Sequence, residues 1–307
     1  MNPRARIASF ALVLGAAFAA AFLLGSGFDS VDTDAGGAHR ETVHDDAGAT
    51  THEGGSAHGA GSENGHGGDQ QDAAKTTPGL AVAEGGYTLR LSPTQLQPGE
   101  SRELRFRIED SEGATVHHFD ELHERDMHLI VVRRDGAHFQ HLHPEMDSDG
   151  TWTIDLTLPA AGVYRLFADF SVGGEPLTMA SDLFARGSFR PQPFPAGAPV
   201  DRVGGYEVRL RDGALTAGAP SALRFLVSRR GGEATEIESY LGAKGHLVAL
   251  REGDLAFLHV HPDEGKPAPS VIPYTATFPT AGRYRLYLQF KHAGQVRTAG
   301  FTVAVRR

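Results

Sequence analysis

The chain has 307 residues, of which 40% are hydrophobic, and it carries a formal net charge of −9. This length suits about two domains, and the hydrophobic content is enough to build a core in each. The negative charge argues against nucleic acid as a partner, because binding phosphate requires clustered positive charge. The sequence contains no cysteine, which excludes disulfides and thiolate metal ligands.

The N-terminal residues 1–28 are predicted to be a signal anchor or a signal peptide. Arg4 and Arg6 precede a long uncharged apolar stretch, so residues 7–28 are expected to contact the membrane, with the rest of the chain outside the cytoplasm. Large apolar residues follow the best small-x-small cleavage site. We therefore favour an uncleaved, single-pass anchor in the cell membrane with the bulk extracytoplasmic, whereas cleavage would give a secreted protein.

Residues 29–78 are rich in Gly, Ala, Ser, Asp and His. They include almost no large apolar side chains, so nothing offsets the entropy lost on ordering, and we predict a disordered linker. Its histidines are His39, His44, His52, His58 and His66. Together with neighbouring carboxylates they can collect divalent metal weakly, or they are incidental to a solvated tether.

Beyond the linker the chain repeats itself. Three pairs of segments recur: GGY at 85–87 and 204–206, LRFRI at 104–108 and LRFLV at 223–227, and LPAAGVYRLFADF at 158–170 and FPTAGRYRLYLQF at 278–290. This duplication predicts two tandem domains, residues 79–188 and 200–307, joined by a Pro/Gly-rich linker at 189–199.

Each repeat consists of short alternating runs, such as YTLRL and TWTIDLTL, separated by Gly, Pro or Asp turns. Neither repeat has a stretch with helical periodicity. The pattern predicts an all-β fold of two tandem Ig-like antiparallel β-sandwiches. Ala-Gly-x-Tyr before a late strand is typical of the tyrosine corner, so Tyr164 and Tyr284 are predicted either to form that corner or to be plain core aromatics.

The segment HLIVVRRDGAHFQHLH in the first repeat predicts a β-hairpin, since its Asp-Gly pair is a strong signal for a two-residue type I′ turn. Counting outward from this turn pairs Ile130 with His141 and His128 with His143. Residues two apart share a face of a strand. Three imidazoles are therefore expected to meet on one face of the hairpin.

The second repeat contains the matching segment HLVALREGDLAFLHVH. With its Gly-Asp pair at the turn, the same count pairs His246 with His261 and Val248 with His259. In both hairpins the face that bears the histidines continues into apolar residues. Each cluster is therefore expected to cap one end of a separate sandwich core and to act independently of the other.

Neutral imidazoles on a rigid β scaffold with little water suit a first-row transition metal. The candidate ligands are His128, His141, His143 and Met146 in the first repeat and His246, His259 and His261 in the second. Imidazole and thioether donors without thiolate favour a copper ion, with a zinc ion as the alternative. This pattern predicts an extracytoplasmic, membrane-tethered metal-binding protein.

The chain is not predicted to be an enzyme, because the repeats share no general base beside the histidines and no Gly-x-Ser-x-Gly motif occurs. The alternative function is a non-catalytic Ig-like interaction module of the cell envelope with an envelope protein as its partner. In that case the histidines serve packing only. Metal uptake by the outer region discriminates between the two functions.

The string MHLIVVRRDGAHFQHLHPE, followed by DGTW and LPAAGVYRLFADF, resembles a family of exported bacterial proteins with tandem Ig-like repeats and a His-x-His-Pro signature. More loosely, it is similar to extracytoplasmic copper-handling β-sandwich proteins with His and Met ligands. The first resemblance covers roughly residues 80–305 and implies export, an Ig-like fold and metal handling. The lack of cysteine departs from blue-copper sites, so that kind of electron transfer is not implied.

Overall fold

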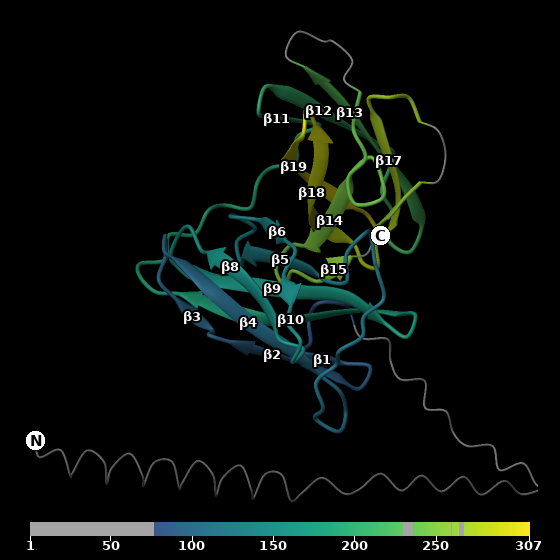
Figure 1. Ribbon diagram of the computed structural model, residues 1–307. Coiled ribbons are helices and arrows are strands. Elements are labelled where there is room, and N and C mark those ends of the chain that lie inside the picture. The colour runs from purple at the N-terminus through teal and green to yellow at the C-terminus, as the bar shows by residue number, and fades with distance from the viewer. Residues whose placement is uncertain (1–76, 230–235, 259, 264–266) are drawn as a thin grey trace, which may run out of the picture. The chain divides into compact units, whose positions relative to one another are not determined.

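The computed structural model describes residues 77–229, 236–258, 260–263 and 267–307. The predicted membrane segment and nearly all of the predicted His-rich linker lie outside these residues. Every secondary-structure element named within the described ranges is a β-strand. No helix in these ranges has the length and hydropathy needed to span a membrane. The strands build two antiparallel sandwiches, as predicted (Figure 1).

The first sandwich has two sheets, and all its strand pairs are antiparallel except β3 with β10. One sheet has the order β1 (Ala83–Glu84), β2 (Tyr87–Ser92), β4 (Ser101–Glu109), β8 (Trp152–Thr157) and β7 (Glu145–Met146). The other has the order β3 (Gln95–Leu96), β10 (Glu175–Ala185), β9 (Gly162–Val172), β5 (His128–Arg133) and β6 (Gln140–Leu142). Strands β2, β4, β8 and β7 correspond to A, B, E and D of the Ig fold, and β5, β9 and β10 correspond to C, F and G.

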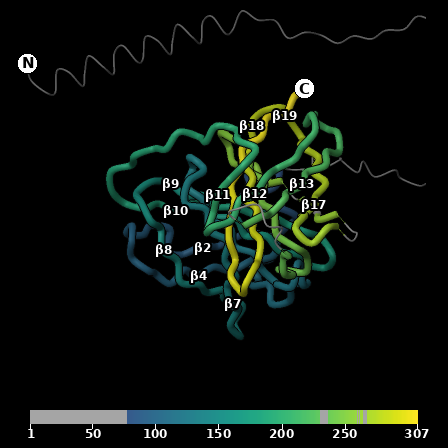
Figure 2. The backbone as a smooth tube through the Cα atoms, turned by 90° about the horizontal axis from the view of Figure 1, so that it is seen from above, coloured from purple at the N-terminus to yellow at the C-terminus, as the bar shows by residue number. Residues whose placement is uncertain are grey.

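The second sandwich repeats this order, except that its second sheet has four described strands and none in the place of β3. Its first sheet runs β11 (Val200–Val203), β12 (Tyr206–Asp212), β13 (Pro220–Arg229), β17 (Val271–Thr277) and β16 (His261–Pro262). Its second sheet runs β15 (Phe257–Leu258), β14 (His246–Arg251), β18 (Gly282–His292) and β19 (Gln295–Val305). The paired strands β18 and β19 are the long yellow segments that adjoin in Figure 2.

The hydrophobic core of each sandwich follows from the alternation of apolar and polar residues along its strands. In β4 the side chains of Leu104, Phe106 and Ile108 are buried, and they alternate with more exposed arginines. Successive residues of a strand face opposite sides, so one face packs inward while the other meets solvent. The aligned residues of β13 do the same in the second sandwich.

The repeated GGY marks a hairpin turn. Gly85 and Gly86 have φ of 60° and 85° and connect β1 to β2, while Gly204 and Gly205 have φ of 57° and 86° and connect β11 to β12. Two successive residues with positive φ are the requirement of a type I′ turn, which glycine meets at little cost. The motif recurs because both repeats need this turn.

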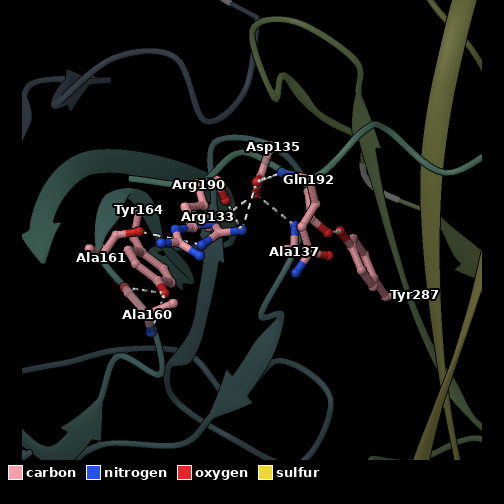
Figure 3. Close-up of polar contacts among 10 residues, drawn as sticks. Arg133, Asp135, Ala137, Ala160, Ala161, Tyr164, Arg190, Gln192 and Tyr287 are labelled. Atoms are coloured by element: carbon pink, nitrogen blue, oxygen red, sulfur yellow. Dashed lines mark hydrogen bonds and ion pairs between the residues drawn. The ribbon is translucent and has the colours of Figure 1, made fainter. Parts of the chain in front are cut away.

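Both predicted tyrosine corners are present. Tyr164 is fully buried, and its hydroxyl donates to the carbonyl of Ala160 at 2.9 Å (Figure 3). In the second repeat the hydroxyl of Tyr284 donates to the carbonyl of Thr280, also at 2.9 Å. The corner fixes the chain where it enters β9 and β18.

Removing one corner hydroxyl tests its contribution to stability. Tyr164→Phe is expected to lower the free energy of unfolding by about 1 kcal/mol, since it deletes the hydrogen bonds between the hydroxyl and the backbone of Ala160 and keeps the ring packing. Urea unfolding followed by the fluorescence of Trp152, the single tryptophan, measures this in the first sandwich. Tyr284→Phe is the matched variant in the second sandwich. A change below about 0.2 kcal/mol would show that the corner is only a packing feature.

A third apolar cluster joins the two sandwiches. It contains Ile130, Val132, Phe167 and Ala180 from the first repeat and Val248, Leu250, Leu255, Phe257 and Tyr287 from the second. The expectation that this face of each hairpin continues into its own sandwich core is therefore wrong. Leu129 and Val131 face the core of the first sandwich, while the alternate residues of β5 face the second repeat.

The junction pairs equivalent faces of the two repeats. Phe139 stacks on Tyr287 with ring centroids 4.1 Å apart, and Phe257 packs on Phe167 at 5.5 Å. Phe167 and Tyr287 occupy matching positions in the two repeats, and so do Phe139 and Phe257. The hydroxyl of Tyr287 also donates to the carbonyl of Gly136 at 2.6 Å (Figure 3).

The segment between the repeats is attached to the first hairpin. Arg133 and Asp135 form a buried ion pair at 2.8 Å, with side chains only 3% and 9% exposed. The backbone N–H of Gln192 donates to Asp135 Oδ2 at 2.7 Å, and Arg133 donates to the carbonyl of Arg190 at 3.4 Å (Figure 3). One ion pair thus links the hairpin turn to the connection between the sandwiches.

Candidate metal centre

The register predicted for the first hairpin is confirmed as far as Leu129, but the predicted pairing of His128 with His143 does not form in the ladder. Strands β5 and β6 pair Ile130 with His141, and the ladder ends at Leu129 opposite Leu142. His143 follows β6, where the chain leaves this sheet and joins the other one as β7. His141 is therefore held by strand pairing, and His143 by the crossing between sheets.

The predicted turn type is wrong. A type I′ turn would need positive φ at both Asp135 and Gly136. Positive φ occurs instead at Gly136 (77°) and His138 (57°). Arg133 donates its N–H to the carbonyl of Ala137 at 2.9 Å, so the loop is longer than two residues. The extra residue is absorbed between Ala137 and β6, and this bulge restores the predicted register.

The three histidines of the first repeat come together. Each offers a ring nitrogen, and these atoms all lie within 4.8 Å of one another. His128 is fully buried, whereas His141 and His143 are half-buried. Neighbouring ring centroids are 5.1 Å apart for His128 and His141 and 4.8 Å apart for His141 and His143.

Carbonyl oxygens set the tautomers of two of these rings. Nε2 of His128 lies 2.7 Å from the carbonyl oxygen of Leu122, and Nδ1 of His141 lies 2.6 Å from Oε1 of Gln289. Carbonyl oxygens only accept hydrogen bonds, so both of these ring nitrogens carry the proton and donate. The other nitrogens, Nδ1 of His128 and Nε2 of His141, are left with lone pairs.

Those two lone pairs face each other at 3.0 Å. Two neutral acceptors cannot form a hydrogen bond, so a cation between them is the arrangement that satisfies both. Metal–imidazole bonds of about 2.0 Å place neighbouring nitrogens roughly 3 to 3.5 Å apart, which matches this spacing. Nε2 of His143 is buried and has no hydrogen-bond partner among the described residues, so it is available as a third ligand.

A metal-free arrangement competes with this one. If the amide of Gln289 is turned over, its NH₂ donates to His141, whose Nε2–H then donates to Nδ1 of His128. The amide as placed donates its Nε2 to Thr298 Oγ1 at 3.4 Å. The flipped network leaves Nε2 of His143 without a partner, so it satisfies fewer of the buried nitrogens.

Burial keeps these imidazoles neutral. It lowers the pKa of His128 to about 4, of His141 to about 3 and of His143 to about 4. Repulsion between the protonated forms of His128 and His141 lowers the pKa of His141 further, and the charge of Arg125 lowers that of His143. Neutral imidazole is the form that ligates metal, so no proton has to leave these rings at neutral pH.

The second repeat adds one described histidine to the same place. The ring of His246 lies 4.5 Å from that of His141 and 5.4 Å from that of His128, on which it stacks. The expectation of two clusters in separate sandwich cores is therefore wrong, because the junction brings the outer faces of β5 and β14 together. Burial, followed by the repulsion that protonated His141 and His128 would exert, lowers the pKa of His246 well below its ordinary value.

The remaining candidates of the second repeat are less well placed. Strands β14 and β15 do have the predicted register, since Ala249 pairs with Leu258. His261 instead pairs with Thr275 in the other sheet, so its predicted pairing with His246 does not form. His259 and the side chain of His261 lie outside the described part of the chain.

Met146 packs against the interior core of the first sandwich. That position explains its apolar character without any metal, and its role as a ligand stays a prediction. The imidazoles are the donors that the described geometry brings together.

His143 also lines a surface pocket. Glu103, Glu145 and Asp155 form its acidic wall. Carboxylates at the mouth of a site raise the local concentration of cations. The pocket therefore places three carboxylates beside His143.

Two groups that orient the ligands were missed from the sequence, Leu122 and Gln289. Gln289 occupies the position in β18 that Asp169 occupies in β9, where they lie opposite His246 and His128 respectively. Alignment of the repeats could have shown a polar residue opposite each leading histidine. It could not have shown that Gln289 contacts His141 of the other repeat.

The model of a domain of unknown function, DUF8832, matches residues 81–186 and again residues 201–307. The chain belongs to the DUF8832 family. Each match covers one sandwich, so a single DUF8832 domain is one Ig-like repeat. No curated protein matches the chain.

Several solved structures are similar to this pair of DUF8832 domains. The Escherichia coli adhesin FdeC matches at 13% identity and a TM-score of 0.25, over 74% of this chain and 66% of that chain. Salmonella alpha-2-macroglobulin reacted with methylamine matches at 15% identity and a TM-score of 0.27, over 75% of this chain and 15% of that chain. The Yersinia pseudotuberculosis adhesin InvE matches at 13% identity and a TM-score of 0.22, over 71% of this chain and 58% of that chain. The chain thus spans less than two thirds of each of these structures.

Proposed function

We propose that the protein binds a transition-metal ion through His128, His141 and His143, and that it holds this metal outside the cytoplasm on a membrane tether. The observation that carries the proposal is the 3.0 Å approach of two ring nitrogens whose protons are committed to carbonyl oxygens. Metal-ligating histidines commonly donate their second ring nitrogen to such an acceptor, which fixes the tautomer and the ring.

Copper(II) is the favoured ion and zinc the second. A donor set of neutral imidazoles accepts both, and the Irving–Williams order places copper(II) above zinc at nitrogen sites. Without thiolate the site lacks the ligand that blue-copper electron transfer needs. We therefore assign the metal a role as cargo or structural ion.

The position of the site supports uptake from solution. The acidic pocket at His143 draws cations, and the His-rich segment between the predicted anchor and the first repeat binds them weakly. Residues 7–28 are proposed to keep the protein at the membrane. In this scheme the tether collects metal and the rigid site retains it.

Replacing one ligand tests the proposal. His141→Ala is expected to weaken copper(II) binding at the tight site at least about 100-fold, the upper end of the loss caused by removing a mere outer-shell partner. Isothermal titration of the full chain in detergent with copper(II), and separately with zinc, measures this. His118→Ala is the matched control, since His118 is an exposed histidine of the same repeat.

The histidines of the linker contribute the same weak uptake to every variant, so the difference between variants isolates the site. Equal uptake by wild type and His141→Ala would support the flipped Gln289 network. The histidines would then be packing groups, and an envelope interaction module would be the better function.

A further inference from the structure

The ring of His246, from the second repeat, lies beside the histidine group of the first repeat. His246 begins β14, and its Nδ1 is buried with no hydrogen-bond partner among the described residues. Its ring lies against those of His141 and His128. We infer that the metal site is shared between the two repeats, with His246 as its fourth imidazole; this inference rests on the proposed function.

The three grouped histidines of the first repeat leave one position of a four-coordinate site to be filled. Structural zinc sites are almost always four-coordinate, and copper(II) prefers four donors in a tetragonal arrangement. His128, His141 and His143 supply three nitrogens within 4.8 Å of one another. A buried ring nitrogen without a partner is costly, so coordination gives Nδ1 of His246 a partner that the described residues do not provide.

The second repeat also orients a ligand of the first. Gln289 lies opposite His246 in the β14–β18 ladder and accepts the Nδ1–H of His141 at 2.6 Å. The matching residue of the first repeat, Asp169, accepts a hydrogen bond from Thr178 at 2.7 Å within its own sandwich. The tautomer of His141 therefore depends on the second repeat.

The junction holds these groups in position. Phe139 and Tyr287 stack at 4.1 Å, and the hydroxyl of Tyr287 donates to Gly136 at 2.6 Å. Both contacts lie on the hairpin that carries His141. A metal ion bound by ligands of both repeats would tie the repeats together at this junction, so that occupancy of the site and docking of the repeats stabilise each other.

The test uses copper(II) alone, added to the full chain at half an equivalent so that the tight site fills before the linker. Pulsed electron paramagnetic resonance counts the imidazoles bound to the ion, and titration gives the affinity. His246→Ala is expected to lower the count from four to three and to weaken binding at least about 100-fold, as expected for loss of a ligand. His118→Ala is expected to change neither value.

Unchanged affinity and an unchanged imidazole count in His246→Ala, with binding still lost in His141→Ala, would overturn the shared site. It would leave the proposed function standing on the first repeat alone. No tight copper(II) binding by the wild type would overturn the proposed function itself. If His246→Ala fails to fold, the wild-type spectrum decides, because three or fewer coordinated imidazoles contradict a fourth ligand.

Discussion

Replacing Asp135 with alanine is expected to lower the free energy of unfolding of the first repeat by about 3 to 5 kcal/mol, because it leaves the Arg133 guanidinium buried without its partner. Two hydrogen bonds, at 2.9 and 2.8 Å, join the two side chains. Burial alone would raise the pKa of Asp135, but hydrogen bonds from Arg133, Gln192 and Ala137 outweigh it and lower the pKa. The carboxylate is therefore charged at neutral pH.

The second repeat contains the matched control. Arg251 and Asp254 form the corresponding pair, although the aspartate lies one position later along the chain, and their side chains are 22% and 40% exposed. Solvent can hydrate Arg251 when Asp254 is removed, so Asp254→Ala is expected to cost about 1 kcal/mol or less. Urea unfolding, by Trp152 fluorescence for the first repeat and by circular dichroism for both, measures the two losses. Equal losses would show that burial does not set the contribution of this ion pair.

Much of the fold could be predicted because its causes are local. Alternating residues such as Leu104 and Phe106 indicate strands, and repeated turn and corner motifs give their order along the chain. The pairing of Ile130 with His141 followed from counting around a turn. The count succeeded although the turn type was wrong, because a bulge compensated for the longer loop.

The site was only partly predictable, because its second half comes from residues far along the chain. All six residues of β5 are buried, and such a run indicates that both faces of a strand are covered. Nothing local says that β14 covers the outer face. The contact of Gln289 with His141 and the approach of His246 depend on that docking, so periodicity could not reveal them.

Replacing Phe167 with alanine is expected to separate the two repeats. Phe167 is fully buried in the junction cluster, where its ring packs on Phe257. Truncating a buried phenylalanine costs about 3 to 5 kcal/mol, through lost transfer energy and the cavity that remains. This loss falls on the contact between repeats, so the first repeat is expected to unfold, by Trp152 fluorescence, at a lower urea concentration than the second.

Phe170→Ala is the control that distinguishes loss of the junction from general destabilisation of the first repeat. Phe170 lies on the same strand, is equally buried and packs in the interior core of the first sandwich. Phe170→Ala is expected to lower the free energy of unfolding by a similar amount, about 3 to 5 kcal/mol. The fraction of this variant that stays folded is expected to retain the junction and the copper(II) affinity of the wild type. Folded Phe167→Ala is expected to bind copper(II) more weakly, because a loosened junction withdraws His246 and Gln289 from His141. Equal copper(II) affinity in the two folded variants would show that docking of the second repeat does not support the histidine site.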